Sequence, residues 1–89
     1  MATIRFTANL RRHVDCPTLE VAGTTLRDVL EDYFRDHARV RDYILDEQGR
    51  MRRHMSAFID GRQVRDRDGL SDEVPAGGTV DIIQSLSGG

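Results

Sequence analysis

The sequence has no lysine, no tryptophan and a single cysteine, and these absences exclude several classes of protein. One cysteine cannot form an internal disulfide, which fits a reducing compartment, and we expect Cys16 to be a small buried thiol. No apolar run approaches the roughly 18 residues of a membrane-spanning helix, and the first residues carry no signal-peptide pattern. We therefore expect a cytoplasmic protein without a membrane partner.

A strong charge of one sign is also lacking. The 13 basic residues, all arginine, and the 15 acidic residues give a net charge of −2, so no nucleic-acid partner is expected. His13, His37 and His54 are far apart in the sequence and have no paired cysteine, which argues against a zinc site. A chain of 89 residues with 38% apolar residues forms one small core and leaves little room for a catalytic cleft.

Alternation of apolar and polar residues predicts five short strands. A polar bend at residues 9–13 separates the first two strands, and Pro17 interrupts the second or places it at a sheet edge. Asp60-Gly61 is a hairpin dipeptide that joins the third strand to the fourth. The strands are expected at residues 3–8, 14–21, 55–59, 63–65 and 79–84.

An apolar stripe at helical spacing predicts one main helix, which we expect to pack on the core rather than to form a partner groove. Thr25 is expected to cap its N-terminus, with Asp28 in the first turn. A weaker pattern around Val40 and Ile44 predicts a short second helix or turn. This order indicates an α+β domain with the main helix on one face of the sheet. The stripe consists of Leu26, Val29, Leu30, Tyr33 and Phe34.

The sequence closes with Gly88-Gly89, directly after Gln84-Ser85-Leu86-Ser87. Neither glycine has a Cβ to pack or to restrict the backbone, so the pair contributes little to a folded structure. It does offer an unhindered carboxylate on a thin tether, which suits a narrow channel that leads to another protein's active site. We therefore expect a domain over residues 1–84 and a flexible tail over residues 85–89.

These features together resemble the MoaD/ThiS family of small sulfur carriers, and the length is closest to the longer MoaD-like and cysteine-pathway carriers. The resemblance implies a ubiquitin-like β-grasp fold, in which a mixed sheet of four to five strands packs on one main helix. It is carried by the element order and by Ala57-Phe58-Ile59-Asp60-Gly61, Val64-Arg65, Gly69-Leu70, Pro75-Ala76-Gly77-Gly78-Thr79-Val80 and Gly88-Gly89.

The resemblance implies a carrier that is not itself an enzyme and that binds no cofactor or metal. An E1-like adenylating enzyme of the MoeB/ThiF type would use ATP-Mg to adenylate the carboxylate of Gly89. A sulfur donor would then displace AMP and leave a thiocarboxylate, with Gly88 providing access. A downstream synthase would accept the sulfur in the biosynthesis of a cofactor, cysteine or a secondary metabolite.

Two apolar side chains are out of phase with the core face and predict a docking patch. Phe58 and Ile83 should point away from the helix, and the tail would add Leu86 and Ser87 to the contact with the activating enzyme. Alternatively, the first two are scattered surface residues and Leu86 folds back on the domain. The basic run at 50–53 is either a solvated loop or a surface that steers an acidic partner.

Two other functions are compatible with the sequence. The chain is alternatively a ubiquitin-like modifier that is conjugated through Gly89 to lysines of other proteins, or a β-grasp binding module without covalent chemistry. Because the chain has no lysine, it cannot form polymers of itself through its side chains. The segment 84–87 is more polar than the proline-containing tail expected of cysteine-pathway carriers, so the receiving pathway stays open.

Overall fold

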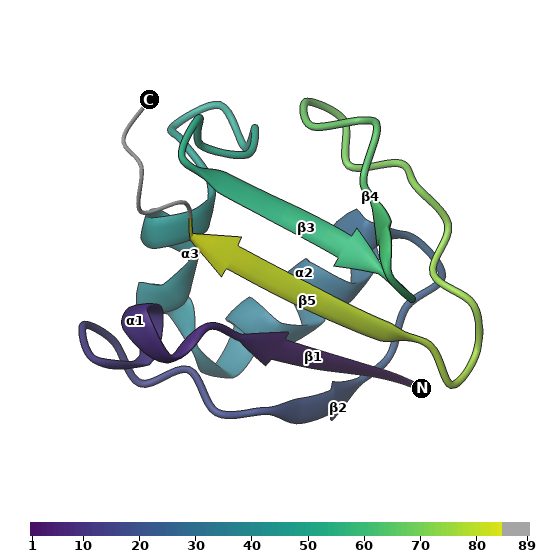
Figure 1. Ribbon diagram of the computed structural model, residues 1–89, viewed down its shortest axis with the longest axis horizontal. Helices are drawn as coiled ribbons and strands as arrows, with labels where there is room; N and C mark the ends of the chain where they lie inside the picture. Colours follow the sequence, from purple (N-terminus) through teal and green to yellow (C-terminus); the bar gives the residue numbers. More distant parts are fainter. Residues whose placement is uncertain (85–89) are drawn as a thin grey trace.

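Residues 1–84, which are the part of the chain that the computed structural model describes, form one mixed sheet with helices packed behind it (Figure 1). The strands are β1 (Ala2–Phe6), β2 (Leu19–Val21), β3 (Met55–Ile59), β4 (Arg62–Gln63) and β5 (Thr79–Gln84). The helices are α1 (Ala8–Arg11), α2 (Leu26–Asp36) and α3 (Ala38–Ile44). This arrangement confirms the predicted α+β class.

The last strand occupies the centre of the sheet. The spatial order is β2-β1-β5-β3-β4, and β5 pairs parallel with β1 and antiparallel with β3. The first and last strands therefore lie side by side, although more than 70 residues separate paired positions such as Thr3 and Thr79. Such a mixed sheet, with one face covered by helices, is the predicted β-grasp topology.

The main helix follows the predicted pattern closely. The hydroxyl oxygen of Thr25 accepts a hydrogen bond of 3.2 Å from the amide of Asp28, so the predicted cap is confirmed. Gly23 precedes the cap with φ of +147°, and a Cβ there would lie 2.7 Å from the amide nitrogen of Val29, so only glycine fits. All five residues of the apolar stripe are buried, namely Leu26, Val29, Leu30, Tyr33 and Phe34.

The β3–β4 hairpin has the predicted turn and register. Asp60 and Gly61 have φ values of +50° and +85°, as a two-residue turn between right-twisted strands requires. Met55, Ala57 and Ile59 are buried, so alternate residues of β3 face the helices. The register that determines the orientation of Phe58 is therefore confirmed.

The connection between the first two strands differs from the prediction. The first strand ends at Phe6 rather than at residue 8, and the short helix α1 takes the place of the expected strand end and of part of the expected polar bend. Leu10 causes the difference, because its side chain is only 1% exposed and draws this segment onto the core. The second strand is much shorter than predicted, since Pro17 has no amide hydrogen and its carbonyl instead accepts a 2.7 Å hydrogen bond from the Tyr33 hydroxyl.

The fourth strand and the single cysteine lie close to their expected positions. The fourth strand covers residues 62 and 63 rather than 63–65, although the amide of Val64 still donates to the carbonyl of Ala57 at 2.9 Å. Cys16 is buried as predicted, and this burial raises the pKa of its thiol. Within residues 1–84, no helix has the length and apolar character needed to cross a membrane.

Candidate functional site

The end of β5 is the point from which the chain continues toward the two C-terminal glycines. Gln84 pairs with Met55 of β3, and its side-chain Oε1 accepts a 3.1 Å hydrogen bond from Asn9 Nδ2 in α1. The amide of Thr7 donates to the carbonyl of Ile82 at 3.2 Å. The end of β5 is therefore held from both sides.

The predicted carrier and tail contacts lie beyond this point. Leu86, Ser87, Gly88 and Gly89 are outside the described residues, as is the proposed tail 85–89, so their roles remain predictions. What the structure does define is the surface that surrounds the end of β5. This surface consists of the helix-free face of the sheet and the loops that flank it (Figure 1).

Phe58 and Ile83 both lie on the helix-free face, as the sequence pattern predicted. Ile83 is 36% exposed, whereas Phe58 is half-buried. Because Phe58 pairs with Asp81 and Ser56 pairs with Ile83, the two apolar side chains occupy diagonal positions on neighbouring strands. Diagonal neighbours of this size are within reach of each other. The structure thus brings them together, while their contact with a partner remains a prediction.

An ion pair crosses the same face beside these two side chains. The guanidinium of Arg5 donates from Nε to Asp81 Oδ1 at 2.7 Å and from a terminal nitrogen to Asp81 Oδ2 at 3.0 Å. This hydrogen-bonded pairing raises the pKa of Arg5. Sequence reasoning missed the pair, because it depends on the parallel alignment of the first strand with the last. In the sequence, each of the two charged residues alternates with core residues of its strand, which indicates only that both lie on the face away from the core.

A shallow groove on the helix-free face combines the apolar pair with charged groups. Among residues 1–84, no group of three or more His, Cys, Asp or Glu side chains is placed to hold a metal ion. The groove combines apolar surface with charged groups that can form hydrogen bonds, and this combination is typical of surfaces that bind other proteins. Its lining includes Arg5, Thr7, Arg11, Phe58, Asp81 and Ile83.

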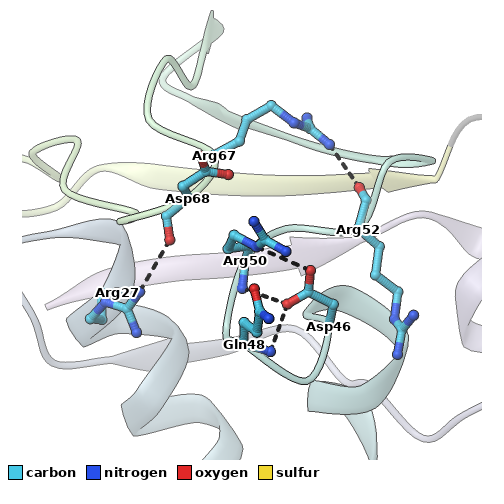
Figure 2. A network of polar contacts seen from close by, with 7 residues as sticks. All are labelled: Arg27, Asp46, Gln48, Arg50, Arg52, Arg67 and Asp68. Carbon is cyan, nitrogen blue, oxygen red and sulfur yellow. Dashed lines mark hydrogen bonds and ion pairs between the residues drawn. The ribbon is translucent and has the colours of Figure 1, made fainter.

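The basic run at 50–53 lies in a loop that is ordered by its own polar contacts (Figure 2). Backbone amides of Arg50 and Gln48 donate to the carboxylate of Asp46 and lower its pKa. Arg52 Nε donates to the carbonyl of Asp42 at 2.7 Å, so its side chain also holds the loop. The side chain of Arg50 also pairs with Asp46 at 3.4 Å, so two of the basic side chains have structural contacts, one within the loop and one with α3.

No family model and no curated protein sequence matches this chain. Solved structures do match it over nearly its whole length. A chain of the Amycolatopsis orientalis BexX/CysO complex aligns over 100% of both chains, with 26% identity and a TM-score of 0.83. Mycobacterium tuberculosis CysO aligns over 97% of this chain and 100% of its own, with 21% identity and a TM-score of 0.81. Small archaeal modifier protein 1 of Methanosarcina acetivorans aligns over 99% and 95%, with 21% identity and a TM-score of 0.80.

The fold and these similarities define the class of the protein as ubiquitin-like β-grasp. The resemblance that the sequence indicated is confirmed at the level of structure, since the chain is similar to CysO and to small archaeal modifier protein 1 over nearly its whole length. One of these neighbours is named a small modifier protein, and another was crystallised in a complex with a second protein.

Proposed function

We propose that this protein is a sulfur carrier that is loaded at the carboxylate of Gly89. The observation that supports the proposal is the position at which the last described strand ends. Central strand β5 ends five residues before Gly89, in a β-grasp domain that matches a chain of the BexX/CysO complex over its full length. A tether of this length extends about 17 Å from the domain when fully stretched.

The chemistry divides between the carrier and its partners. An E1-like enzyme of the MoeB/ThiF type binds ATP-Mg, and the Gly89 carboxylate attacks the α-phosphate to form an acyl adenylate with release of pyrophosphate. Hydrosulfide, free or released by a donor, attacks the acyl carbon, and AMP leaves as the bond between the acyl carbon and its phosphate oxygen breaks. The resulting thiocarboxylate delivers its sulfur to a downstream synthase. Gly88 and Gly89 leave the acyl carbon open to these attacks.

The helix-free face supplies the recognition surface in this proposal. Phe58 and Ile83 form its apolar part, and Leu86 and Ser87 extend the contact along the tail. The partner complex in which the A. orientalis neighbour was crystallised supports a protein-binding role. We also propose a cytoplasmic location, because the single buried thiol of Cys16 suits a reducing compartment.

Conjugation to other proteins is a second candidate, because the match from M. acetivorans is a modifier protein. In that case the Gly89 carboxyl group would form an amide with a lysine side chain of a target. The target would be a different protein, since this chain has no lysine.

Intact-mass measurement after co-expression with the E1-like enzyme of the same genome tests both functions. We expect the wild-type carrier to gain the mass of one oxygen-to-sulfur replacement. Deletion of Gly89 should abolish this gain and leave the unfolding midpoint unchanged, whereas Ser85→Ala, which keeps both glycines, should load normally. Higher-mass adducts with other proteins would favour the modifier, and sulfur loading without Gly89 would overturn the carrier proposal.

A further inference from the structure

The tripeptide Arg-Arg-His occurs twice in the sequence, at residues 11–13 and 52–54. Each copy follows an apolar residue that is buried in the core, Leu10 in one case and Met51 in the other. The last two residues of each copy, Arg12-His13 and Arg53-His54, lie in a turn that follows that anchor. The repetition is inconspicuous in the sequence, because 38 residues separate the copies.

The fold brings the two copies to opposite sides of the end of β5. Residues 52–54 directly precede Met55, which pairs with Gln84. On the other side, Asn9 is hydrogen-bonded to Gln84, and Arg11 lines the same groove as Ile83. Figure 1 shows α1 and the start of β3 on either side of the tip of the β5 arrow.

Hydrogen bonds fix both turns. Arg67 donates to the carbonyls of Arg52 and Met55 at 2.7 and 2.6 Å, and the first of these bonds is drawn in Figure 2. In the other turn, the amides of His13 and Val14 donate to the carbonyl of Leu10 at 3.0 and 3.2 Å. The backbone positions from which the exposed side chains extend are therefore defined.

The local charge contrasts with the net charge of −2 of the whole chain. Arg12 and Arg53 are exposed, and among residues 1–84 neither has a carboxylate within ion-pair distance. Carboxylates are also near, because Asp15, Asp36 and Asp42 share a pocket with His13 and Arg39, and Asp46 and Asp68 share another with Arg50, Arg52, Arg53 and Arg67. Together with Arg11 and Arg12, seven arginines face these five carboxylates, and Asp46 already accepts a hydrogen bond from the amide of Arg50. A net positive surface thus flanks the point where the tail begins.

We propose that the two Arg-Arg-His turns, residues 11–13 and 52–54, form a basic collar that docks on carboxylates around the entrance to the partner's active site. This inference rests on the proposed carrier function and adds the charge of the partner surface. Complementary charge around the tail would steer and orient the encounter, so the collar should act on association rather than on the chemical step. The partner's entrance should therefore be acidic.

Charge reversal on the collar tests the inference. ATP–pyrophosphate exchange by the E1-like enzyme is measured against carrier concentration and salt for the double variant Arg12→Glu/Arg53→Glu. We expect KM for the carrier to rise about tenfold at low salt, kcat to stay within about twofold, and the salt dependence of kcat/KM to flatten. Arg12→Lys/Arg53→Lys should retain wild-type values because it keeps the charge.

The matched control is Arg62→Glu/Arg65→Glu, because these exposed arginines lie in and beside β4, near the hairpin at the other end of β3. It should leave KM within about twofold of wild type. Equal KM values for collar and control variants would overturn the collar, as would lysine variants that are as impaired as the glutamate variants. Isothermal titration of ATP-Mg into the carrier alone is a further test. If the wild-type carrier binds ATP-Mg and the collar variants do not, the collar is a nucleotide site and the docking proposal is wrong.

The outcomes also separate the two proposals. If the wild-type carrier supports ATP–pyrophosphate exchange and the collar substitutions do not change KM, only the collar proposal is refuted. Absence of exchange and of any mass gain with wild-type carrier would refute the carrier function and the collar with it. Denaturant midpoints of all variants should equal that of the wild type, because the substituted side chains are exposed.

Discussion

The two faces of the sheet are built from alternate residues of the same strands, yet their side chains have different surroundings. On the helix-covered face, Val80 and Ile82 of β5 are completely buried. On the helix-free face, Asp81 of the same strand pairs with Arg5, and Ile83 is exposed. The covered face is explained by the requirements of folding, whereas the helix-free face contains groups that folding does not require.

This difference separates residues that maintain the domain from residues that are available for recognition. Burial of the apolar residues on the covered face supplies most of the stability of so small a domain. An exposed ion pair contributes little to stability in water. Residues on the helix-free face can therefore be chosen for their contacts with a partner, and substitutions on the two faces should have different consequences.

The largest expected effect is on the covered side. Phe34→Ala should lower the free energy of unfolding by about 3–5 kcal/mol, because it removes a buried ring and leaves a cavity. Phe58→Ala is the matched substitution on the helix-free face, and it should cost about 1 kcal/mol or less, since this ring is only half-buried. Urea denaturation measures both variants. Equal losses would contradict the separation of the two faces.

An intermediate effect is expected from charges placed in the apolar patch. Ile83→Asp and Phe58→Asp should each raise KM of the carrier about tenfold in ATP–pyrophosphate exchange, because an unpaired charge is buried at the contact. Leu86→Asp should also lower kcat, since residue 86 is three positions from the reacting carbon. Leu19→Asp on β2 is the control, because Leu19 and Ile83 are equally exposed at 36%.

These four variants distinguish a specific docking face from a general sensitivity of the enzyme to charge. Wild-type KM for both Ile83→Asp and Phe58→Asp would exclude the helix-free face as the docking surface. If Leu19→Asp raises KM as much as Ile83→Asp does, the enzyme responds to a negative charge anywhere on the carrier surface. Both interpretations require that the variants are folded, so their denaturant midpoints must stay near the wild-type value.

The sequence was sufficient wherever local patterns determine the structure. The stripe of α2, its cap at Thr25 and the register of β3 all follow from spacing within a few residues. The short helix α1 was missed because one buried residue, Leu10, lies in a polar segment with no recognisable period. Such a single anchor is decided by tertiary packing rather than by local propensity.

The surface around the end of β5 was predicted less completely. Phe58 and Ile83 were found because they break the alternation of their strands. The Arg5–Asp81 pair and the collar were not found, because each joins segments that only the complete sheet brings together. The roles of Gly88 and Gly89 were inferred from chemistry, and these residues lie outside the described part of the chain.

The smallest expected effect concerns the Arg5–Asp81 pair. Arg5→Gln, Asp81→Asn and the double variant should all unfold at the wild-type denaturant midpoint, because both groups are solvent-accessible and water screens their attraction. A double-mutant cycle measured in low and high salt isolates the interaction between them. Coupling that is large and independent of salt would show that the pair stabilises the sheet, and the helix-free face would then be partly a folding surface. Negligible coupling leaves the pair available for recognition beside Phe58 and Ile83.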